Sequence, residues 1–558
     1  MKKKVLPLAV GAATAVTMSA AHAAMYVNDK GMGETLIFPF YSAESGNNTA
    51  IHVVNTTAGT KAVKVRIMEA ENSQEVLDFN LYMSPADHFS FGIVADGDGA
   101  KIVTGDNSCT VPAIPADGQP FVSFKYDGTI GAGDSSEGDD DGVGAFDNTG
   151  IERTRVGYVE VIEMGQLDPD AAPALDTTPA SDTYTPINAV DAITHGADGV
   201  PANCDLLVEA WSLIDDVPGT WYAEADDNVT QATAEFLTNW AGGGLYGYAR
   251  VLNVAEGSAF GYDALAIASH VAAGASGSAM HYRPGSIYPN FGDDAMDTEA
   301  TINVNGEAIT LDFDGTVYPA DSTNRVQALN SLIMATAIHN DFVTDSSINA
   351  ETDWITTFPT KHFHINGVTE GVEPFATLWN GQSACEDTNL APIDREEQTP
   401  VIPDEPTTSA GPDFSPAPPP GAGPAAPAST DVPLCYESTV VMMAETSAVK
   451  AENSVGLGVN ASLHADDGWA TMSFDPASLD DDIPFSCDVD GEALENEVAE
   501  GATPCDRVID AGTHTVTGLP VVGFAVQKYV NLEATPGGAG YYAMATAHKT
   551  SVTVSEDN

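Results

Sequence analysis

His362 and His364 are the only close pair among the twelve histidines of this chain. They flank Phe363, and on a β-strand alternate side chains point to the same face. Two imidazoles on one face suit zinc or copper, and His339 is a candidate third ligand. The spacing predicts a transition-metal site at His362 and His364, with two ordinary surface histidines as the alternative.

Clustered aspartates next to glycines form a second group of candidate ligands. Asp96 and Asp98 lie in the run D-G-D-G, and Asp139 and Asp141 lie in D-D-D-G. Carboxylates on flexible loops suit a hard cation, although neither run matches the twelve-residue EF-hand loop. We therefore predict calcium at either loop, as the one cofactor of the chain. Chance clustering among the 81 acidic residues is the alternative.

The run L-D-F-D-G-T-V at residues 311–317 resembles the first motif of phosphatases of the haloacid-dehalogenase type. In that family one aspartate attacks phosphorus and the other acts as acid and base, which would assign these roles to Asp312 and Asp314. Asn305-Gly306, just upstream, is instead the strongest short-range signal for an antiparallel hairpin. We therefore interpret the run as a solvated hairpin strand and assign no catalytic residue.

Six cysteines are spread along the chain, and the even number in an exported protein predicts disulfides. Six allow 15 pairings, which the sequence cannot distinguish. Pairing of neighbours gives Cys109 with Cys204, Cys385 with Cys435, and Cys487 with Cys505, so that each bridge closes one loop-rich insertion. There is no C-x-x-C pair, as a thioredoxin-like centre or a zinc ribbon would require.

The elements that must position these residues have the pattern of β-strands. Short apolar runs recur about every ten residues, as in an antiparallel sandwich. Residues 62–68 (A-V-K-V-R-I-M) alternate apolar and charged side chains, which predicts a half-buried strand. The fold class expected is mainly β, with antiparallel β-sandwich-like domains, long loop insertions and one or two helices.

The organisation follows from composition and periodicity. Apolar residues at 326, 329, 333 and 337 form one stripe, which predicts a helix over 324–342. The proline-rich run near 415–427 cannot bury a core and predicts a disordered loop. The expected divisions are a signal peptide (1–23), an N-terminal β-sandwich (24–127), a central β-rich region (128–395), the proline-rich loop (396–432) and a C-terminal β-rich region (433–558).

The start of the chain has the form of an export signal. Lys2, Lys3 and Lys4 precede an apolar run, and Ala21-His22-Ala23 is a typical cleavage site. The apolar run is too short to span a membrane, and no later run is long enough. We therefore expect an extracytoplasmic protein without a transmembrane segment, located in the periplasm, at the cell surface or in the medium.

The charge is strongly acidic, with 20 basic against 81 acidic residues and a formal net charge of −61. Nucleic acids and anionic lipids need a basic surface, so the composition disfavours both as partners. High ionic strength screens such self-repulsion, which indicates saline surroundings and a marine or halophilic source. A calcium-loaded protein whose carboxylates are ligands is the other interpretation.

Several segments resemble a family of exported bacterial proteins usually labelled hypothetical or cell-surface proteins. The matching segments are residues 53–57 (V-V-N-T-T), 62–66, 75–81, 243–247 (G-G-L-Y-G), 352–354, 358–361 (F-P-T-K), 518–521 and 523–524. They span most of the chain after the export signal. The family has no assigned activity, so the resemblance implies export and a surface location but no catalytic residue.

Taken together, these features favour a secreted, non-catalytic structural or adhesion protein of the cell surface or extracellular space. Its partners would be other surface proteins or polysaccharide. Enzyme activity is uncertain and less expected, because the sequence contains no G-x-S-x-G, H-E-x-x-H or P-loop motif. A secreted hydrolase of an extracellular polymer is the alternative, since glycosidases need only two well-placed acids.

Overall fold

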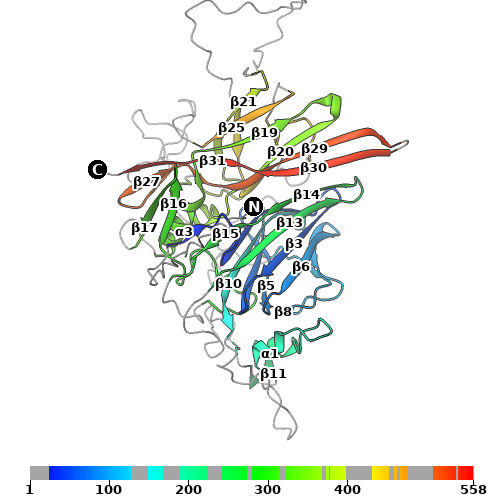
Figure 1. Ribbon diagram of the computed structural model, residues 1–558, viewed down its shortest axis with the longest axis vertical. Helices are drawn as coiled ribbons and strands as arrows, with labels where there is room; N and C mark the ends of the chain where they lie inside the picture. The colour runs from blue at the N-terminus through cyan, green and yellow to red at the C-terminus, as the bar shows by residue number, and fades with distance from the viewer. Residues whose placement is uncertain are drawn as a thin grey trace, which may run out of the picture.

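The structure is a computed structural model with mainly antiparallel β architecture, as the sequence predicts (Figure 1). It describes residues 24–126, 149–167, 188–214, 217–219, 221–222, 242–272, 280–314, 321–366, 373–375, 377–396, 430–451, 458–461, 466–474, 507–535 and 538–556. The expected signal peptide, Asp139, Asp141, Cys487, Cys505 and most of the proline-rich loop lie outside these residues.

The first sandwich consists of two antiparallel sheets of described strands. In spatial order, one contains β1 (Tyr26–Val27), β15 (Leu265–Ala268), β2 (Thr35–Ser42), β10 (Val156–Leu167), β4 (Thr60–Glu69), β5 (Glu75–Met83) and β8 (Cys109–Val111). The other contains β14 (Ser258–Asp263), β13 (Leu245–Asn253), β3 (Asn47–Asn55), β6 (His88–Asp96), β7 (Gly99–Val103) and β9 (Gln119–Pro120). Their facing sides bury one apolar core, which includes Phe38, Val65, Phe79 and Phe91.

The second sandwich also has two sheets among the described residues. One contains β22 (Thr430–Leu434), β21 (Glu386–Asp394), β25 (Asp467–Ser473), β19 (Ala337–Val343) and β31 (Lys549–Ser551). The other contains β24 (Gly458–Asn460), β23 (Ser438–Met442), β20 (Ala350–Thr357), β29 (Val522–Thr535) and β30 (Gly538–Ala547), with β23 and β24 parallel. Trp354, Phe358 and Met472 lie in the core between these sheets.

Smaller elements cover the sandwiches. They are β11 (Leu213–Ile214) with β12 (Val217–Pro218), β16 (Glu299–Val304) with β17 (Glu307–Asp312), β18 (Met334–Ala335) with β28 (Leu519–Pro520), and β26 (Val508–Asp510) with β27 (His514–Thr517) and β32 (Thr553–Glu556). The helices are α1 (Ala189–Ile193), α2 (Asp205–Ala210), α3 (Asp321–Ile333) and α4 (His362–Ile365), with 3₁₀ turns η2 (Ile151–Arg155) and η3 (Ser346–Ile348). Of the helices described, none is long and apolar enough to cross a bilayer.

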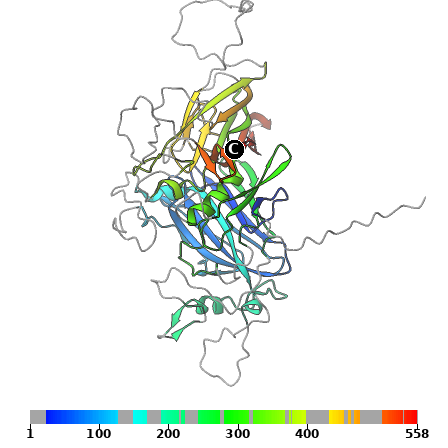
Figure 2. The ribbon, with the colours of Figure 1, turned by 90° about the vertical axis from the view of Figure 1, so that its left-hand side faces the viewer.

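The two sandwiches share a third apolar core where they meet. Phe260 and Phe40 of the first sandwich pack with Ile355, Phe524 and Val526 of the second. The side-by-side course of β14 and β30 is visible in Figure 1, and the stacking of the sandwiches along the long axis is visible in Figure 2. Burial of large aromatic side chains on both sides fixes how the sandwiches lie relative to each other.

Hydrogen bonds reinforce this contact. Thr357 Oγ1 donates to the carbonyl oxygen of Pro39 at 2.6 Å. The backbone N–H groups of Glu437 and Ser438 donate to the carbonyl oxygens of Glu71 and Ala70 at 3.1 and 2.9 Å. Because these donors and acceptors are buried, each bond adds to the stability of the contact between the sandwiches.

The hairpin predicted at Asn305-Gly306 is confirmed. Asn305 and Gly306 connect β16 to β17 with φ angles of 53° and 89°, the left-handed conformation of a two-residue turn of this kind. Leu311 is buried on β17, whereas Asp312 is exposed at the end of the strand. The two turn residues alone were therefore enough to predict this hairpin.

The helix predicted over 324–342 is correct only in its first half. Helix α3 ends at Ile333, and Ala337, the last residue of the predicted stripe, lies on strand β19. That strand pairs on one side with β25 and on the other with β31, so that His339 lies opposite both Thr471 and Lys549. Pairing with strands more than a hundred residues away overrides the local helical pattern.

The domain boundary predicted at residue 127 lies inside the first sandwich. Strand β10 pairs with both β2 and β4, and β13 pairs with β3, although both strands belong to the region predicted as central. The boundary at residue 432 likewise falls within β22. Because long insertions separate the paired strands in the sequence, local patterns do not predict that these strands pair.

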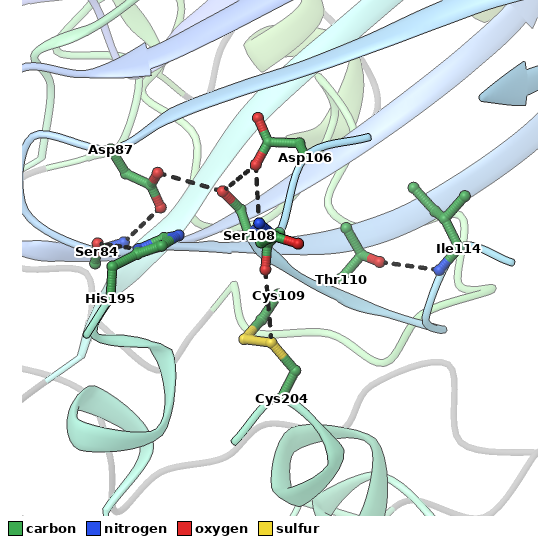
Figure 3. Close-up of a disulfide and its surroundings, with 10 residues drawn as sticks. Ser84, Asp87, Asp106, Ser108, Cys109, Thr110, Ile114, His195 and Cys204 are labelled. Atoms are coloured by element: carbon green, nitrogen blue, oxygen red, sulfur yellow. Dashed lines mark hydrogen bonds between the residues drawn. A yellow bond between two sulfur atoms is a disulfide. The ribbon is translucent and has the colours of Figure 1, made fainter. Parts of the chain in front are cut away.

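Two of the predicted disulfides are present. Cys109 on β8 is bonded to Cys204, directly before α2, and Cys385 is bonded to Cys435. Figure 3 shows the first bridge beside Ser84, whose hydroxyl lies 3.1 Å from His195 Nδ1. The α1–α2 segment is therefore attached to the edge of the first sandwich at two points.

We expect proteolysis without reductant to release two cross-linked peptides, one joining Cys109 to Cys204 and one joining Cys385 to Cys435. Mass spectrometry before and after reduction measures this directly. The same map tests the pair Cys487–Cys505, which stays a prediction. Recovery of Cys109 joined to any other cysteine, or as a free thiol, would contradict the assignment.

Candidate functional site

A groove with a volume of about 790 Å³ lies where the sandwiches meet. Strands β13, β14 and β15 form one wall, and the end of α3 with β29, β30 and β31 forms the other. Its volume falls within the range of about 300–1,000 Å³ that is usual for small-molecule sites. Cavities of this size between domains are the default position for a binding site.

The wall from the first sandwich carries the polar groups. Tyr248 and Arg250 on β13 and Asp263 on β14 project from the same face, because Tyr248 pairs directly with Asp263. The guanidinium of Arg250 lies 5.0 Å from the centre of the Tyr248 ring. These side chains form the rim of the groove, where Arg250 and Asp263 are exposed to solvent.

A row of planar rings continues from this rim across the sheet. The Tyr248 ring stacks on His52 of β3 with centroids 4.4 Å apart, and His52 Nδ1 lies 3.2 Å from His88 Nε2. Partial burial, with His88 and Arg250 nearby, lowers the pKa of His52, so the ring is neutral at neutral pH. We call Tyr248, His52 and His88 the ring platform.

The opposite wall is mainly apolar. Leu332 and Ile333 from the end of α3 and Val522 from β29 line it. At the floor, Tyr262 stacks on Phe524 with centroids 4.4 Å apart and donates its hydroxyl hydrogen bond to the carbonyl oxygen of Phe40. The floor is thus fixed by contacts between the two sandwiches.

His548 is the titratable group of the apolar wall. Its Nε2 donates to the carbonyl oxygen of Ile355 at 3.0 Å, and its Nδ1 accepts from Asn340 Nδ2 at 3.0 Å. Burial lowers the pKa of His548 to about 4, against a smaller opposing effect of the bond to Ile355. The ring is therefore neutral at neutral pH and held in one orientation.

Asp263 is the one carboxylate among the described residues that line the groove. Glycoside hydrolysis by the common mechanisms needs two carboxyl groups, about 5–10 Å apart, on either side of the bond. The lining instead combines an apolar wall with a polar, aromatic rim. Among the described residues that line the groove, no second carboxyl group accompanies Asp263.

The strand predicted at His362 and His364 is wrong. Both residues lie on helix α4, where side chains two positions apart point in different directions. His364 is buried and lies 2.9 Å from Asn330 Nδ2, while His362 Nδ1 faces Glu437 at 3.9 Å. His339, the candidate third ligand, bonds Thr471 and Ser551. The transition-metal site stays a prediction, but the shared strand face on which it was based is absent from these residues.

The first calcium candidate is a tight hairpin turn. Asp96 ends β6 and Gly99 begins β7, with Gly97 and Asp98 between them. Asp96 Oδ1 lies 3.2 Å from Lys101 Nζ, and Arg155 donates to the carbonyl oxygen of Gly97 at 2.6 Å. Lys101 already pairs with Asp96, and Arg155 already occupies the carbonyl of Gly97, so calcium there gains no support. No described group of three or more ligand-type side chains could hold a metal.

Asp312 and Asp314 are both exposed beyond the β16–β17 turn, and Asp312 Oδ1 accepts from the backbone N–H of Asp314 at 2.8 Å. In the phosphatase motif the first aspartate ends a strand of a parallel sheet, whereas β17 pairs antiparallel with β16. The interpretation as a solvated hairpin is consistent with this placement.

Sequence reasoning missed a set of buried ion pairs. Lys61, Lys64 and Arg66 of β4 are all buried, although alternation predicted that one face of this strand is solvated. Arg66 Nε lies 2.7 Å from Glu75 and its Nη1 lies 2.9 Å from Glu160. The only signal in the sequence is that β4 carries three bases and β10 carries two acids, Glu160 and Glu163.

Arg153 forms a second buried centre at the end of the first sandwich. Its guanidinium contacts Glu69 Oε1 at 2.8 Å and Glu69 Oε2 at 3.0 Å, and it lies 4.2 Å from the centre of the Tyr126 ring. Glu71 lies 3.5 Å away and carries the carbonyl that bonds Glu437 of the second sandwich. The centre thus adjoins the contact between the sandwiches.

Comparison with protein-family models, with curated protein sequences and with solved structures found no match to this chain.

Proposed function

We propose that the protein is an extracytoplasmic, non-catalytic binding protein that acts in adhesion or matrix assembly at the cell surface. The observation that carries the proposal is the groove of about 790 Å³ between the sandwiches, whose described lining contains a single carboxylate. The export signal in the sequence and the two disulfides support a location outside the cytoplasm. The resemblance to exported surface proteins points the same way.

The ligand we propose is a segment of a neutral polysaccharide. The rim suits sugar hydroxyl groups, because the Tyr248 hydroxyl, the Arg250 guanidinium and the Asp263 carboxylate supply hydrogen-bond donors and acceptors. A net charge of −61 repels polyanions, which favours an uncharged polymer. The ring platform extends from the groove across the sheet, so that several sugar units could be contacted in a row.

Replacement of Tyr248 by alanine is expected to weaken binding of neutral glycans at least tenfold. The change removes the ring of the platform that lines the groove, and loss of a central aromatic contact commonly costs about 2 kcal/mol or more. Binding of the purified mature protein to an array of neutral and acidic glycans, followed by titration of the best binder, measures the effect.

The matched control is Tyr542→Ala. Tyr542 on β30 is 59% exposed and does not line the groove, so its removal should leave glycan affinity unchanged. Absence of binding to every neutral glycan would overturn the ligand class. Release of shortened glycan during incubation would instead favour the polymer hydrolase.

A further inference from the structure

Lys61 and Glu163 form an ion pair that is closed off from solvent. Lys61 lies on β4 and Glu163 on the neighbouring strand β10, and both side chains have no exposed surface. Lys61 Nζ is 2.7 Å from Glu163 Oε1. An amine and a carboxyl group are thus held in contact in a place from which water is excluded.

We propose that Lys61 and Glu163 condense into an amide, a covalent cross-link between β4 and β10. The inference is independent of the proposed ligand and of the groove. It assigns a self-modification site to the first sandwich and no external substrate or cofactor.

The reaction is balanced by the loss of one water. A proton first passes from the ammonium group to the carboxylate along the 2.7 Å contact. The neutral Nζ of Lys61 then attacks Cδ of Glu163, so that the Nζ–Cδ bond forms and the Cδ–Oε1 bond breaks. Oε1 leaves as water with the carboxyl proton and one proton from Nζ, and nothing is oxidised or reduced.

Burial favours the neutral reactants. Taking both charges out of water penalises the ion pair relative to an amine and an acid. Burial raises the pKa of the Glu163 carboxyl to about 7, even though Lys61 attracts its charged form. Near neutral pH a substantial fraction of this carboxyl can therefore be protonated.

Two further groups complete the arrangement. The backbone N–H of Gly243 donates to Glu163 Oε2 at 2.9 Å, on the oxygen that stays in the amide. A fixed donor there stabilises the negative charge that develops on this oxygen during attack. Glu34 lies across from Glu163, since the Glu163 N–H donates to the Glu34 carbonyl oxygen at 2.9 Å. Directly opposite side chains share one face of a sheet, and the Glu34 carboxyl, whose Oε2 accepts from the backbone N–H of Val271 at 3.0 Å, lies close enough to raise the pKa of Glu163.

Lys64 provides an internal comparison on the same strand. It pairs with Asp78, whose side chain retains 8% exposure, and its Nζ also donates to the carbonyl oxygen of Arg283 at 3.1 Å. That carbonyl is a second acceptor for the Nζ of Lys64, whereas among the described residues the Nζ of Lys61 contacts Glu163 alone. Lys61 is therefore the better-placed nucleophile of the two buried lysines.

The test is the mass of the purified, mature protein under denaturing conditions. We expect a mass about 18 Da below that of the disulfide-bonded chain, corresponding to one lost water. Trypsin cannot cleave after an acylated lysine, so a branched peptide that joins the segments around Lys61 and Glu163 should be recovered after reduction.

Two matched variants locate the link. Lys61→Arg keeps a positive charge but should abolish the mass deficit, whereas Lys64→Arg should retain it. A wild-type chain of full mass that yields a tryptic peptide ending at Lys61 would overturn the proposal, whatever the stability of the variants. A deficit lost in Lys64→Arg and kept in Lys61→Arg would overturn the assignment to Lys61.

Discussion

Replacement of Arg153 by methionine is expected to lower the free energy of unfolding by about 3–5 kcal/mol. The side chain of Arg153 is fully buried, as is that of Glu69, which it contacts through two nitrogens. Methionine fills much of the volume but leaves Glu69 and Glu71 without their cation in a place with little access to water. The penalty of the unpaired carboxylates, more than the lost attraction, sets the size of the effect.

Urea unfolding monitored by tryptophan fluorescence gives the difference between variant and wild type. The control is Arg395→Met, since Arg395 pairs with Asp467 at 2.7 Å but is 69% exposed. A surface pair of this kind contributes at most about 1 kcal/mol. Equal effects of the two substitutions would show that burial does not determine the strength of the Arg153 centre.

The predictions from sequence succeeded where short-range chemistry decides the structure. Asn305-Gly306 needs only two residues that tolerate positive φ, and these residues specify the turn whatever surrounds it. The pairing of Cys109 with Cys204 and of Cys385 with Cys435 followed from proximity along the chain. The class of the fold followed from period-two alternation, which is also a local property.

The burial of β4 shows where such reasoning fails. Its alternation correctly predicts a strand, but Lys64 and Arg66 do not face water. Segments far along the chain cover this face. The backbone N–H of Gly285 donates to the Asp78 carboxylate that pairs with Lys64, and the backbone carbonyl oxygen of Arg283 accepts from Lys64 Nζ. A charged side chain in a strand indicates a solvent-exposed face only when no other segment packs on that face. For β4, the packing comes from residues about two hundred positions further along the chain.

The groove could not have been predicted for the same reason. Tyr248 and Phe524 belong to segments that meet only because the two sandwiches share a core. The prediction at His362 and His364 failed because the type of element was wrong. Side chains two positions apart share a face on a strand but point in different directions on a helix. Residue types suggest chemistry, but the type of element decides whether their side chains converge.

Acidification is expected to destabilise the protein through His270. Its side chain is fully buried, with Nδ1 2.7 Å from Thr35 Oγ1 and no hydrogen-bond partner for Nε2 among the described residues. Burial lowers the pKa of His270 from 6.5 to about 3. Below pH 6.5, His270 binds a proton in the unfolded chain but stays neutral in the folded chain. The free energy of unfolding therefore falls as the pH falls. Between pH 6.5 and about pH 4 the loss is about 3 kcal/mol.

The measurement is the difference in unfolding free energy between these two pH values, compared with a His270→Gln variant. Glutamine can still bond Thr35 but takes up no proton, so the variant should lose about 3 kcal/mol less than the wild type over this range. Buried carboxyls such as Glu386, whose pKa burial raises, titrate alike in both proteins and cancel in the comparison. The control His514→Gln, on the half-buried strand β27, shows how far a histidine-to-glutamine change alone alters unfolding. Parallel profiles for wild type and His270→Gln would show that His270 is not the group that the folded chain keeps neutral.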